Sequence, residues 1–113
     1  MGYRRALWSG LSAHAVGRLT GQLIQAADPL HGTWHVAGAP LSKYELLTRL
    51  AQRLPERRFK VVPDNSFVCD RTLDGSAFAM RAGYAPPDWD DQLDELVADI
   101  RRRWRPDSPA YWV

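Results

Sequence analysis

The sequence predicts a small α/β domain, in which helices pack on two or three short strands. The chain has 113 residues, which suits one small domain. Apolar residues recur at three- and four-residue steps in several segments, as they do on one face of a helix. Short β-branched or aromatic runs lie between these segments, and strand–helix–strand crossovers favour parallel pairing. Such a sheet could close its own core or form the edge of a larger doubly wound sheet.

The composition is that of an ordinary globular domain, with 45% apolar and 25% charged residues. The net charge of +2 is too small to indicate nucleic-acid binding. The apolar runs are too short to span a membrane, and the first ten residues are too polar for a signal peptide. The single cysteine, Cys69, cannot form an internal disulfide, so we expect a cytoplasmic location.

The first third of the chain reads as strand, helix and strand. Tyr3–Trp8 is the first predicted strand. Ser12 is a suitable N-cap for a helix over Ala13–Ala27, which Asp28-Pro29 ends. Thr33–Val36 is short, β-branched or aromatic, and bounded by glycine, so it is the second predicted strand.

The next helix has the clearest start signal in the sequence. Ser42 and Glu45 have the spacing of a capping box, in which each side chain binds the other residue's backbone N–H. Leu41 and Leu46 occupy the positions of a hydrophobic staple, which fixes the direction of the chain into the helix. We expect this helix to end near Leu54.

The second half of the chain predicts a strand and two helices. Phe59–Val62 is the third predicted strand, closed by Pro63-Asp64-Asn65. A short helix capped by Asp74 ends at Gly83, which suits the left-handed C′ position.

The last helix is expected over Trp89–Trp104, with Asp88 as its N-cap. The arginines at its end are favoured there by the negative end of the helix dipole. The low net charge favours this interpretation over nucleic-acid binding. The domain is expected to cover residues 1–105, and residues 106–113 form an irregular tail.

Most catalytic and cofactor signatures are missing from the sequence. A dinucleotide needs a glycine-rich turn of the GxGxxG or GxxGxxG type, and none occurs. No metal site is predicted, because the histidines lack ligand spacing and Cys69 is alone. No nucleophile-elbow motif supports a Ser-His-Asp hydrolase.

Arg71 is the most interesting charged residue, because it precedes a predicted helix start. An arginine beside such a turn can bind a phosphate through two parallel hydrogen bonds. Alternatively, Arg71 could brace the loop in an ion pair with a neighbouring aspartate. The residues alone leave both readings open.

Four segments carry a family resemblance that covers residues 4–96. Residues 5–12 (RALWSGLS) resemble a loop that enters a substrate-binding domain, and residues 41–47 (LSKYELL) resemble the helix after a late strand. Residues 69–74 (CDRTLD) resemble an Asp-Arg-Ser-Leu-Asp segment, and residues 83–89 (GYAPPDW) resemble a Gly-Tyr/Trp-x-Pro-Pro-x-Trp segment. Together they resemble the C-terminal, substrate-binding region of extended short-chain dehydrogenase/reductases acting on nucleotide sugars. The branch is that of dTDP-4-dehydrorhamnose reductase-like proteins within the NAD-dependent epimerase/dehydratase family.

The resemblance implies a complete protein that reduces, epimerises or dehydrates a sugar on a nucleoside diphosphate with NAD(P). In such enzymes an N-terminal Rossmann domain holds the cofactor. Here we expect only the small α/β substrate-binding subdomain, with the Rossmann domain absent. The family's catalytic Tyr-x-x-x-Lys pair is also missing, because no lysine lies four residues after Tyr3, Tyr44, Tyr84 or Tyr111. We therefore expect neither NAD(P) binding nor catalysis from this chain alone.

Two functions from different classes follow. The first is the substrate-recognition portion of a nucleotide-sugar oxidoreductase or epimerase, working with a separately encoded Rossmann domain or by self-association. Its expected ligand is a nucleoside-diphosphate sugar, bound by Arg5, Trp8, Ser12 and Arg71, and the resemblance favours the phosphate-binding role of Arg71. The alternative is a non-enzymatic protein-interaction module that keeps the fold without binding the ligand.

Overall fold

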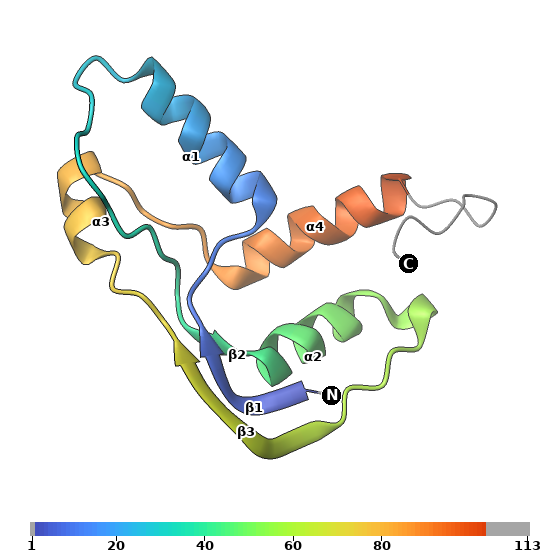
Figure 1. Ribbon diagram of the computed structural model, residues 1–113. Helices are drawn as coiled ribbons and strands as arrows, with labels where there is room; N and C mark the ends of the chain where they lie inside the picture. The colour runs from blue at the N-terminus through green and yellow to red at the C-terminus, as the bar shows by residue number, and fades with distance from the viewer. Residues whose placement is uncertain (1, 104–113) are drawn as a thin grey trace.

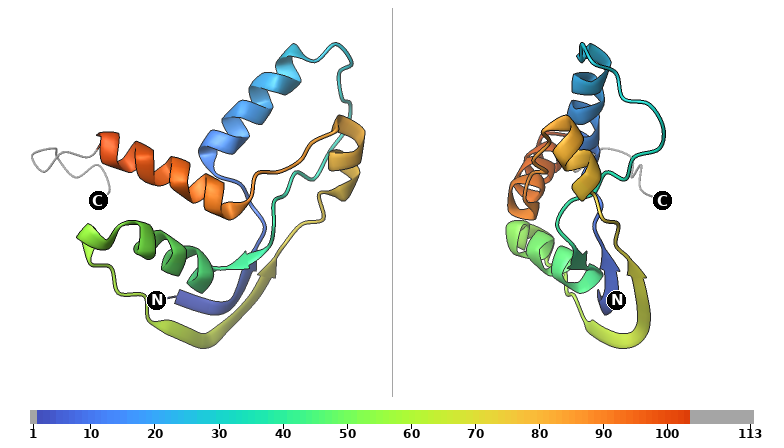
Figure 2. Two further views of the ribbon diagram at one scale, coloured as in Figure 1. Left: turned by 180° about the vertical axis from the view of Figure 1, so that it is seen from behind. Right: turned by 90° about the vertical axis from the view of Figure 1, so that its left-hand side faces the viewer.

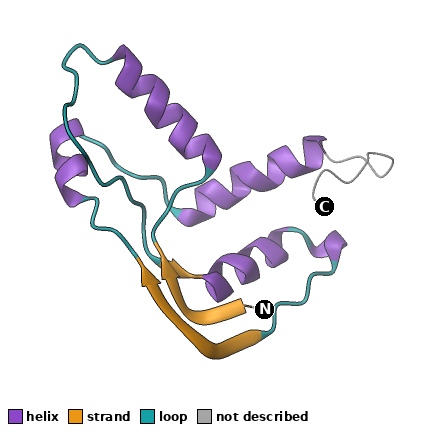
Figure 3. Ribbon diagram, in the orientation of Figure 1, coloured by secondary structure: helices purple, strands orange, loops and turns teal. Residues whose placement is uncertain are grey.

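A three-stranded mixed sheet carries four helices in the computed structural model, which describes residues 2–103 (Figures 1 and 3). The predicted α/β class, with helices on a sheet of two or three strands, is confirmed. The elements run in the order β1 (Gly2–Trp8), α1 (Ala13–Gln25), β2 (Leu41–Ser42), α2 (Lys43–Arg53), a 3₁₀ turn (Pro55–Arg57), β3 (Pro63–Arg71), α3 (Ser76–Ala82) and α4 (Trp89–Arg103).

The central strand of the sheet is β1, and the strand order is β2-β1-β3. β3 runs parallel to β1, as the crossover rule predicts, and the register places Trp8 beside Arg71. β2 is antiparallel to β1, with Trp8 opposite Leu41 and Leu7 opposite Ser42. The sheet is therefore mixed, with one parallel and one antiparallel pair. β2 has only two residues and leads directly into α2.

Two of the predicted strands are wrong. Thr33–Val36 has no regular structure, and its aromatic residue is used in packing instead: the Trp34 indole donates to the His31 carbonyl and contacts the Phe78 ring. Phe59–Val62 is not a strand either. Pairing begins only where the Gly2 N–H donates to the Val62 carbonyl, at 2.9 Å.

The third strand instead occupies Pro63–Arg71 and includes the predicted turn Pro63-Asp64-Asn65. The Asp64 carboxylate accepts the Ser66 N–H at 2.7 Å, so a local turn is built into the strand. The register with β1 is irregular over this stretch and regular from Val68 to Arg71. Pairing with a distant segment thus overrides the local turn signal.

The predicted helix caps are mostly confirmed. The Ser12 and Ser42 hydroxyls each accept the backbone N–H three residues later, at 3.1 Å, and the Asp88 carboxylate accepts the Asp91 N–H at 2.8 Å. Gly83 is left-handed, with φ of 62°. The prediction for Asp74 is one residue early: Gly75 is the cap of α3, and the Asp74 carboxylate accepts the Ser76 N–H at 2.9 Å.

Only one half of the predicted capping box is formed by the described residues. The Glu45 carboxylate lies 3.8 Å from the Arg49 guanidinium, one helical turn further on. An exposed ion pair of this kind contributes little to stability. The Ser42 hydroxyl is therefore the part of the box that anchors α2.

The main core lies between β2, α2 and α4, which Figures 1 and 2 show side by side. Leu41, Trp89 and Leu93 are its buried members, and the half-buried Leu46, Leu50 and Leu96 surround them. Arg53 also joins α2 to α4, with 2.8 Å contacts to Asp90 and Asp94. α1 joins α4 through a 2.7 Å ion pair between Arg18 and Glu95.

The molecule is flat and open. It extends 46 × 36 × 23 Å, with a Cα radius of gyration of 16.5 Å. A compact domain of this length has a radius of gyration of about 13 Å. The α1 and α3 helices lie beyond the carboxyl ends of β1 and β3, away from the sheet (Figures 1 and 2). Much of the apolar surface is left uncovered as a result.

The predicted end of the last helix at Trp104, the domain boundary at residue 105 and the tail over residues 106–113 lie outside the described residues. Within residues 2–103, no helix combines the length and the apolar character that crossing a bilayer requires.

We predict that Ser42→Ala lowers the free energy of unfolding by about 1 kcal/mol, because α2 loses its N-cap hydrogen bond. Glu45→Ala is the control and should cost less, since its carboxylate makes only an exposed ion pair. Chemical denaturation of the two variants measures both effects. An unchanged midpoint in Ser42→Ala would contradict the role of this cap.

Candidate functional site

The larger of two described surface cavities has a volume of about 480 Å³ and lies over one face of the sheet, against the start of α2. Its lining is mostly apolar, with aromatic rings and two cations and with no carboxylate among the lining residues. The residues that give it this character are Tyr3, Trp8, Lys43, Phe67 and Arg71. A cavity of this kind suits a planar, anionic ligand.

Trp8 and Arg71 meet because each is the last residue of its strand and the strands are parallel. Ligands of open α/β sheets commonly bind at the carboxyl ends of parallel strands. The loop after β3 is held there by Ser9, whose buried hydroxyl accepts the Leu73 N–H at 2.8 Å. Two residues that the sequence analysis singled out separately thus line one cavity.

Trp8 is held from two sides and still has 39% of its surface exposed. Its ring centroid lies 5.4 Å from that of the buried Trp89, at an interplanar angle of 44°. Its indole also covers Gly10 so closely that a Cβ there would lie 1.9 Å from a ring carbon. The exposed part of a ring fixed in this way offers a contact surface at little cost in conformational entropy.

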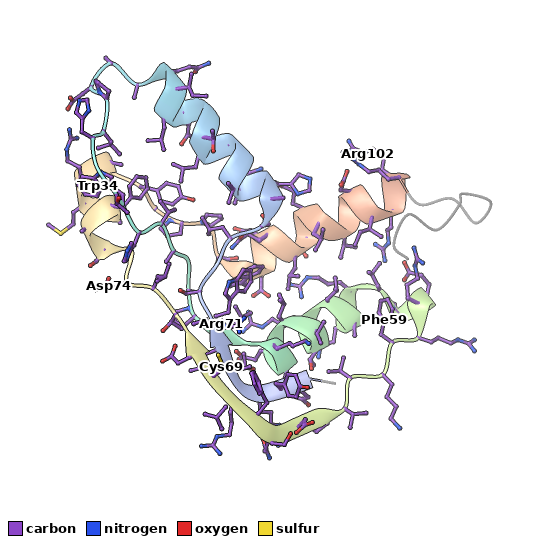
Figure 4. The ribbon with its side chains drawn as sticks, viewed as in Figure 1. Trp34, Phe59, Cys69, Arg71, Asp74 and Arg102 are labelled. Atoms are coloured by element: carbon purple, nitrogen blue, oxygen red, sulfur yellow. The ribbon has the colours of Figure 1, made fainter. Side chains whose placement is uncertain are left out.

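Arg71, labelled in Figure 4, makes no hydrogen bond or ion pair with any other residue in the range 2–103. The Asp70 carboxylate is used locally, accepting the Thr72 N–H at 2.9 Å and the Thr72 hydroxyl at 2.6 Å. The Thr72 hydrogen bonds lower the pKa of the Asp70 carboxyl, which keeps that carboxylate charged and engaged. Asp74 is engaged with Ser76 in the same way. The ion pair that would brace the loop is therefore not formed among these residues.

Lys43 is a second cation at the cavity, and the sequence analysis did not propose it as a site residue. It is the first residue of α2, directly after the Ser42 cap. Its ammonium nitrogen lies 5.1 Å from the centroid of the Tyr3 ring. In the sequence, Lys43 stands out only as a member of the LSKYELL segment. That segment does not indicate that the Lys43 side chain contacts Tyr3 of β1.

The other two predicted binding residues lie away from this cavity. Arg5 precedes Trp8 by three residues in a regular stretch of β1, so it projects from the opposite face of the sheet. The Ser12 hydroxyl accepts the Ala15 N–H, and its own N–H donates to the Gln92 side chain at 2.7 Å. The structure thus brings together Trp8 and Arg71 but not Arg5 and Ser12.

A tyrosine and a lysine do approach each other, but not as a proton donor and its activator. The Lys43 ammonium faces the Tyr3 ring, as in a cation–π contact. At Tyr84, burial raises the pKa of the phenol, whereas a catalytic tyrosine needs its pKa lowered. Neither tyrosine therefore has a lysine placed to lower the pKa of its phenol.

NAD(P), which the resemblance implies for the complete enzyme, does not fit the residues described here. The turn from β1 into α1 is the candidate place, because a pyrophosphate would approach its glycine and the N-terminus of α1. The Trp8 indole covers Gly10, and the Gln92 amide oxygen takes the Ser12 N–H. Likewise, no cluster of three or more His, Cys, Asp or Glu side chains in residues 2–103 forms a metal site.

The second cavity, of about 360 Å³, lies between residues 31–35 and the start of α3. Its lining includes the exposed Asp74 carboxylate together with His31 and His35. Figure 4 labels Trp34 and Asp74 near α3, and Arg71 at the end of β3. A carboxylate in the lining disfavours an anionic ligand, so the cavity at Trp8 and Arg71 is the stronger candidate.

Comparisons of the chain with models of protein families, with curated proteins and with solved structures find no match. The resemblance to nucleotide-sugar reductases therefore stays a prediction from the sequence.

We predict that Gly10→Ala displaces the Trp8 indole, shifts the summed fluorescence of the five tryptophans to longer wavelength and lowers stability by about 1–3 kcal/mol. Gly21→Ala in α1 is the matched control, since a Cβ there meets nothing within 4 Å. That control should raise stability by about 0.5–1 kcal/mol, because alanine favours a helix. Equal fluorescence and stability in the two variants would show that Trp8 does not lie over Gly10.

Proposed function

We propose that this chain is the substrate-recognition portion of a nucleotide-sugar oxidoreductase or epimerase of the dTDP-4-dehydrorhamnose reductase-like type. The observation that carries the proposal is an unpaired Arg71 beside a fixed, partly exposed Trp8, in a cavity without a carboxylate. The segment resemblance supports it independently, because Trp8 and Arg71 belong to two different matching segments.

The two cations suit a diphosphate. Arg71 presents a planar fork of donors that can bind two phosphate oxygens at once. Lys43 offers a compact positive charge from α2. No carboxylate lines the cavity, so a ligand with two negative charges contacts no like charge there.

The aromatic residues suit the nucleoside. A nucleobase is flat and aromatic, and the exposed part of Trp8 provides a surface for stacking. The ligand would then lie with its base at Trp8 and its diphosphate at Arg71 and Lys43. Half of a binding cleft holds its ligand weakly, so we expect a dissociation constant well above the micromolar range.

In this proposal the chain binds and orients the nucleotide and does not transform the sugar. A separately encoded Rossmann domain would supply NAD(P) and the hydride transfer. The residues of this chain would contribute the anion and base contacts and would exclude water from that side of the ligand.

Calorimetric titration of dTDP, UDP and GDP sugars tests the proposal. Arg71→Ala should weaken binding about tenfold or more, because a charge-assisted phosphate contact is lost. Arg102→Ala is the matched control: Figure 4 places Arg102 at the far end of α4, where it pairs with Asp99. Wild-type affinity should fall with added salt, and NADH should not bind at micromolar concentration.

Three results would count against the proposal. Equal binding by wild type and Arg71→Ala would overturn the site, and micromolar NADH binding would overturn the assignment of the cofactor to another domain. If no sugar nucleotide binds at millimolar concentration, the recognition role is excluded for the isolated chain.

The second candidate function is a protein-interaction module without ligand. It is favoured by the large apolar side chains that the open fold leaves exposed, among them Ile24 at 79% and Met80 at 86%. Apolar side chains mark an interaction site where they gather into one contiguous patch. The titration separates the two functions, because a pure interaction module binds none of the sugar nucleotides.

A further inference from the structure

The second cavity, between residues 31–35 and the start of α3, has the opposite chemistry to the first. The described residues that line it include a carboxylate, an indole and two imidazoles, and neither lysine nor arginine. They are Asp74, Trp34, His31 and His35. A carboxylate and the face of an aromatic ring each attract a positive charge. The second cavity therefore fits a cation, and it shares no lining residue with the proposed nucleotide site.

Close packing of two segments that are distant in sequence builds this cavity. Gly75, the cap of α3, approaches Ala37 so closely that a Cβ on the glycine would lie 2.9 Å from the Ala37 backbone nitrogen. The buried Phe78 ring of α3 contacts the Trp34 ring, with 6.5 Å between the centroids. Because the Trp34 indole N–H also donates to the His31 carbonyl at 2.9 Å, the ring is held in place at the cavity wall.

Asp74 supplies the negative charge of the cavity and, like Trp34, is labelled near α3 in Figure 4. Its carboxylate accepts the Ser76 N–H at 2.9 Å. A carboxylate can accept about four hydrogen bonds, so capacity for a ligand remains. The bonds from Ser76 lower the pKa of the Asp74 carboxyl, which keeps it ionised at neutral pH. Among residues 2–103, no lysine or arginine forms an ion pair with Asp74.

His31 and His35 add two aromatic rings that carry acceptor nitrogens. They lie four residues apart in a stretch without regular structure, and both line the cavity. A neutral imidazole offers one acceptor nitrogen, which suits a ligand that donates N–H groups. Within the described part of the chain, these side chains and Asp74 do not group as metal ligands. The chemistry of the lining thus suits an organic cation with N–H donors.

We propose that the second cavity binds an alkylammonium group, which lies between the Asp74 carboxylate and the Trp34 ring. The carboxylate accepts a charge-assisted hydrogen bond, and tryptophan is the aromatic residue with the strongest cation–π attraction. A compact ammonium fits better than a planar guanidinium, because Ser76 already binds the carboxylate that a guanidinium fork would engage through both oxygens. The ammonium can belong to a free amine or to a lysine side chain of a partner protein, since both present the same group.

NMR titration of the full chain with n-butylamine tests the proposal at neutral pH, where the amine is charged. We expect the signals of the lining residues to shift, the Trp34 indole N–H among them. One small ammonium group should bind with a dissociation constant on the order of 1 mM. The uncharged n-butanol has a similar size and should bind about tenfold more weakly or worse.

Asp74→Asn should weaken the binding of n-butylamine about tenfold or more, because the charged partner is lost. Asparagine keeps a side-chain oxygen for the Ser76 N–H, so the turn into α3 should be retained. Asp64→Asn is the matched control and should leave binding unchanged. Asp64 accepts the Ser66 N–H at 2.7 Å in the same way, but it lies on β3 and does not line the cavity.

A blocked lysine, acetylated at its amino end and amidated at its carboxyl end, separates the two sources of the ammonium group. Tighter binding of the blocked lysine than of n-butylamine identifies a partner's side chain, and equal or weaker binding identifies a free amine. The proposal is overturned if n-butylamine does not bind at about 10 mM or if n-butanol binds as well as the amine. It is also overturned if Asp64→Asn and Asp74→Asn weaken binding equally.

Discussion

The buried amide of Gln92 is the constraint on which the rest of the structure depends. Its oxygen accepts the Ser12 N–H at 2.7 Å, and its nitrogen donates to the Pro87 carbonyl at 3.0 Å. These two bonds fix the start of α4 against the start of α1. Trp89 is thereby held where its indole donates to the Ala39 carbonyl, and its ring supports Trp8. Gln92, a polar residue that does not line the cavity, therefore helps to fix the position of Trp8 in the cavity wall.

The charge of the cavity depends on a different kind of local bond. Asp70 and Asp74 lie close to Arg71 in sequence, and each is engaged by a backbone N–H two residues further on. Asp70 and Arg71 are successive residues of β3, so their side chains project from opposite faces of the sheet. Neither Asp70 nor Asp74 pairs with Arg71 among the described residues. The same loop that looks like a structural salt bridge in the sequence thus leaves its guanidinium open to an anion, which is the property a phosphate site needs.

The sequence predicted what depends on neighbouring residues. The caps at Ser12, Ser42 and Asp88 were correct, because a capping hydrogen bond joins groups only three residues apart. β3 was misplaced, because Pro63–Asn65 has the composition of a turn and becomes a strand only by pairing with β1. Lys43 was missed as a cavity residue for the same reason: its position on α2 is local, but its meeting with Tyr3 is not.

The unfolding free energy of Gln92→Leu tests the central claim most directly. Leucine has a similar size but cannot bond the Ser12 N–H or the Pro87 carbonyl, so both groups would lose their buried partner. We expect a loss of about 1–3 kcal/mol, together with a change in the summed tryptophan fluorescence. Gln52→Leu, at an exposed position of α2, should change stability by no more than about 0.5 kcal/mol. Equal stability of the two variants, with unchanged tryptophan fluorescence, would contradict the account.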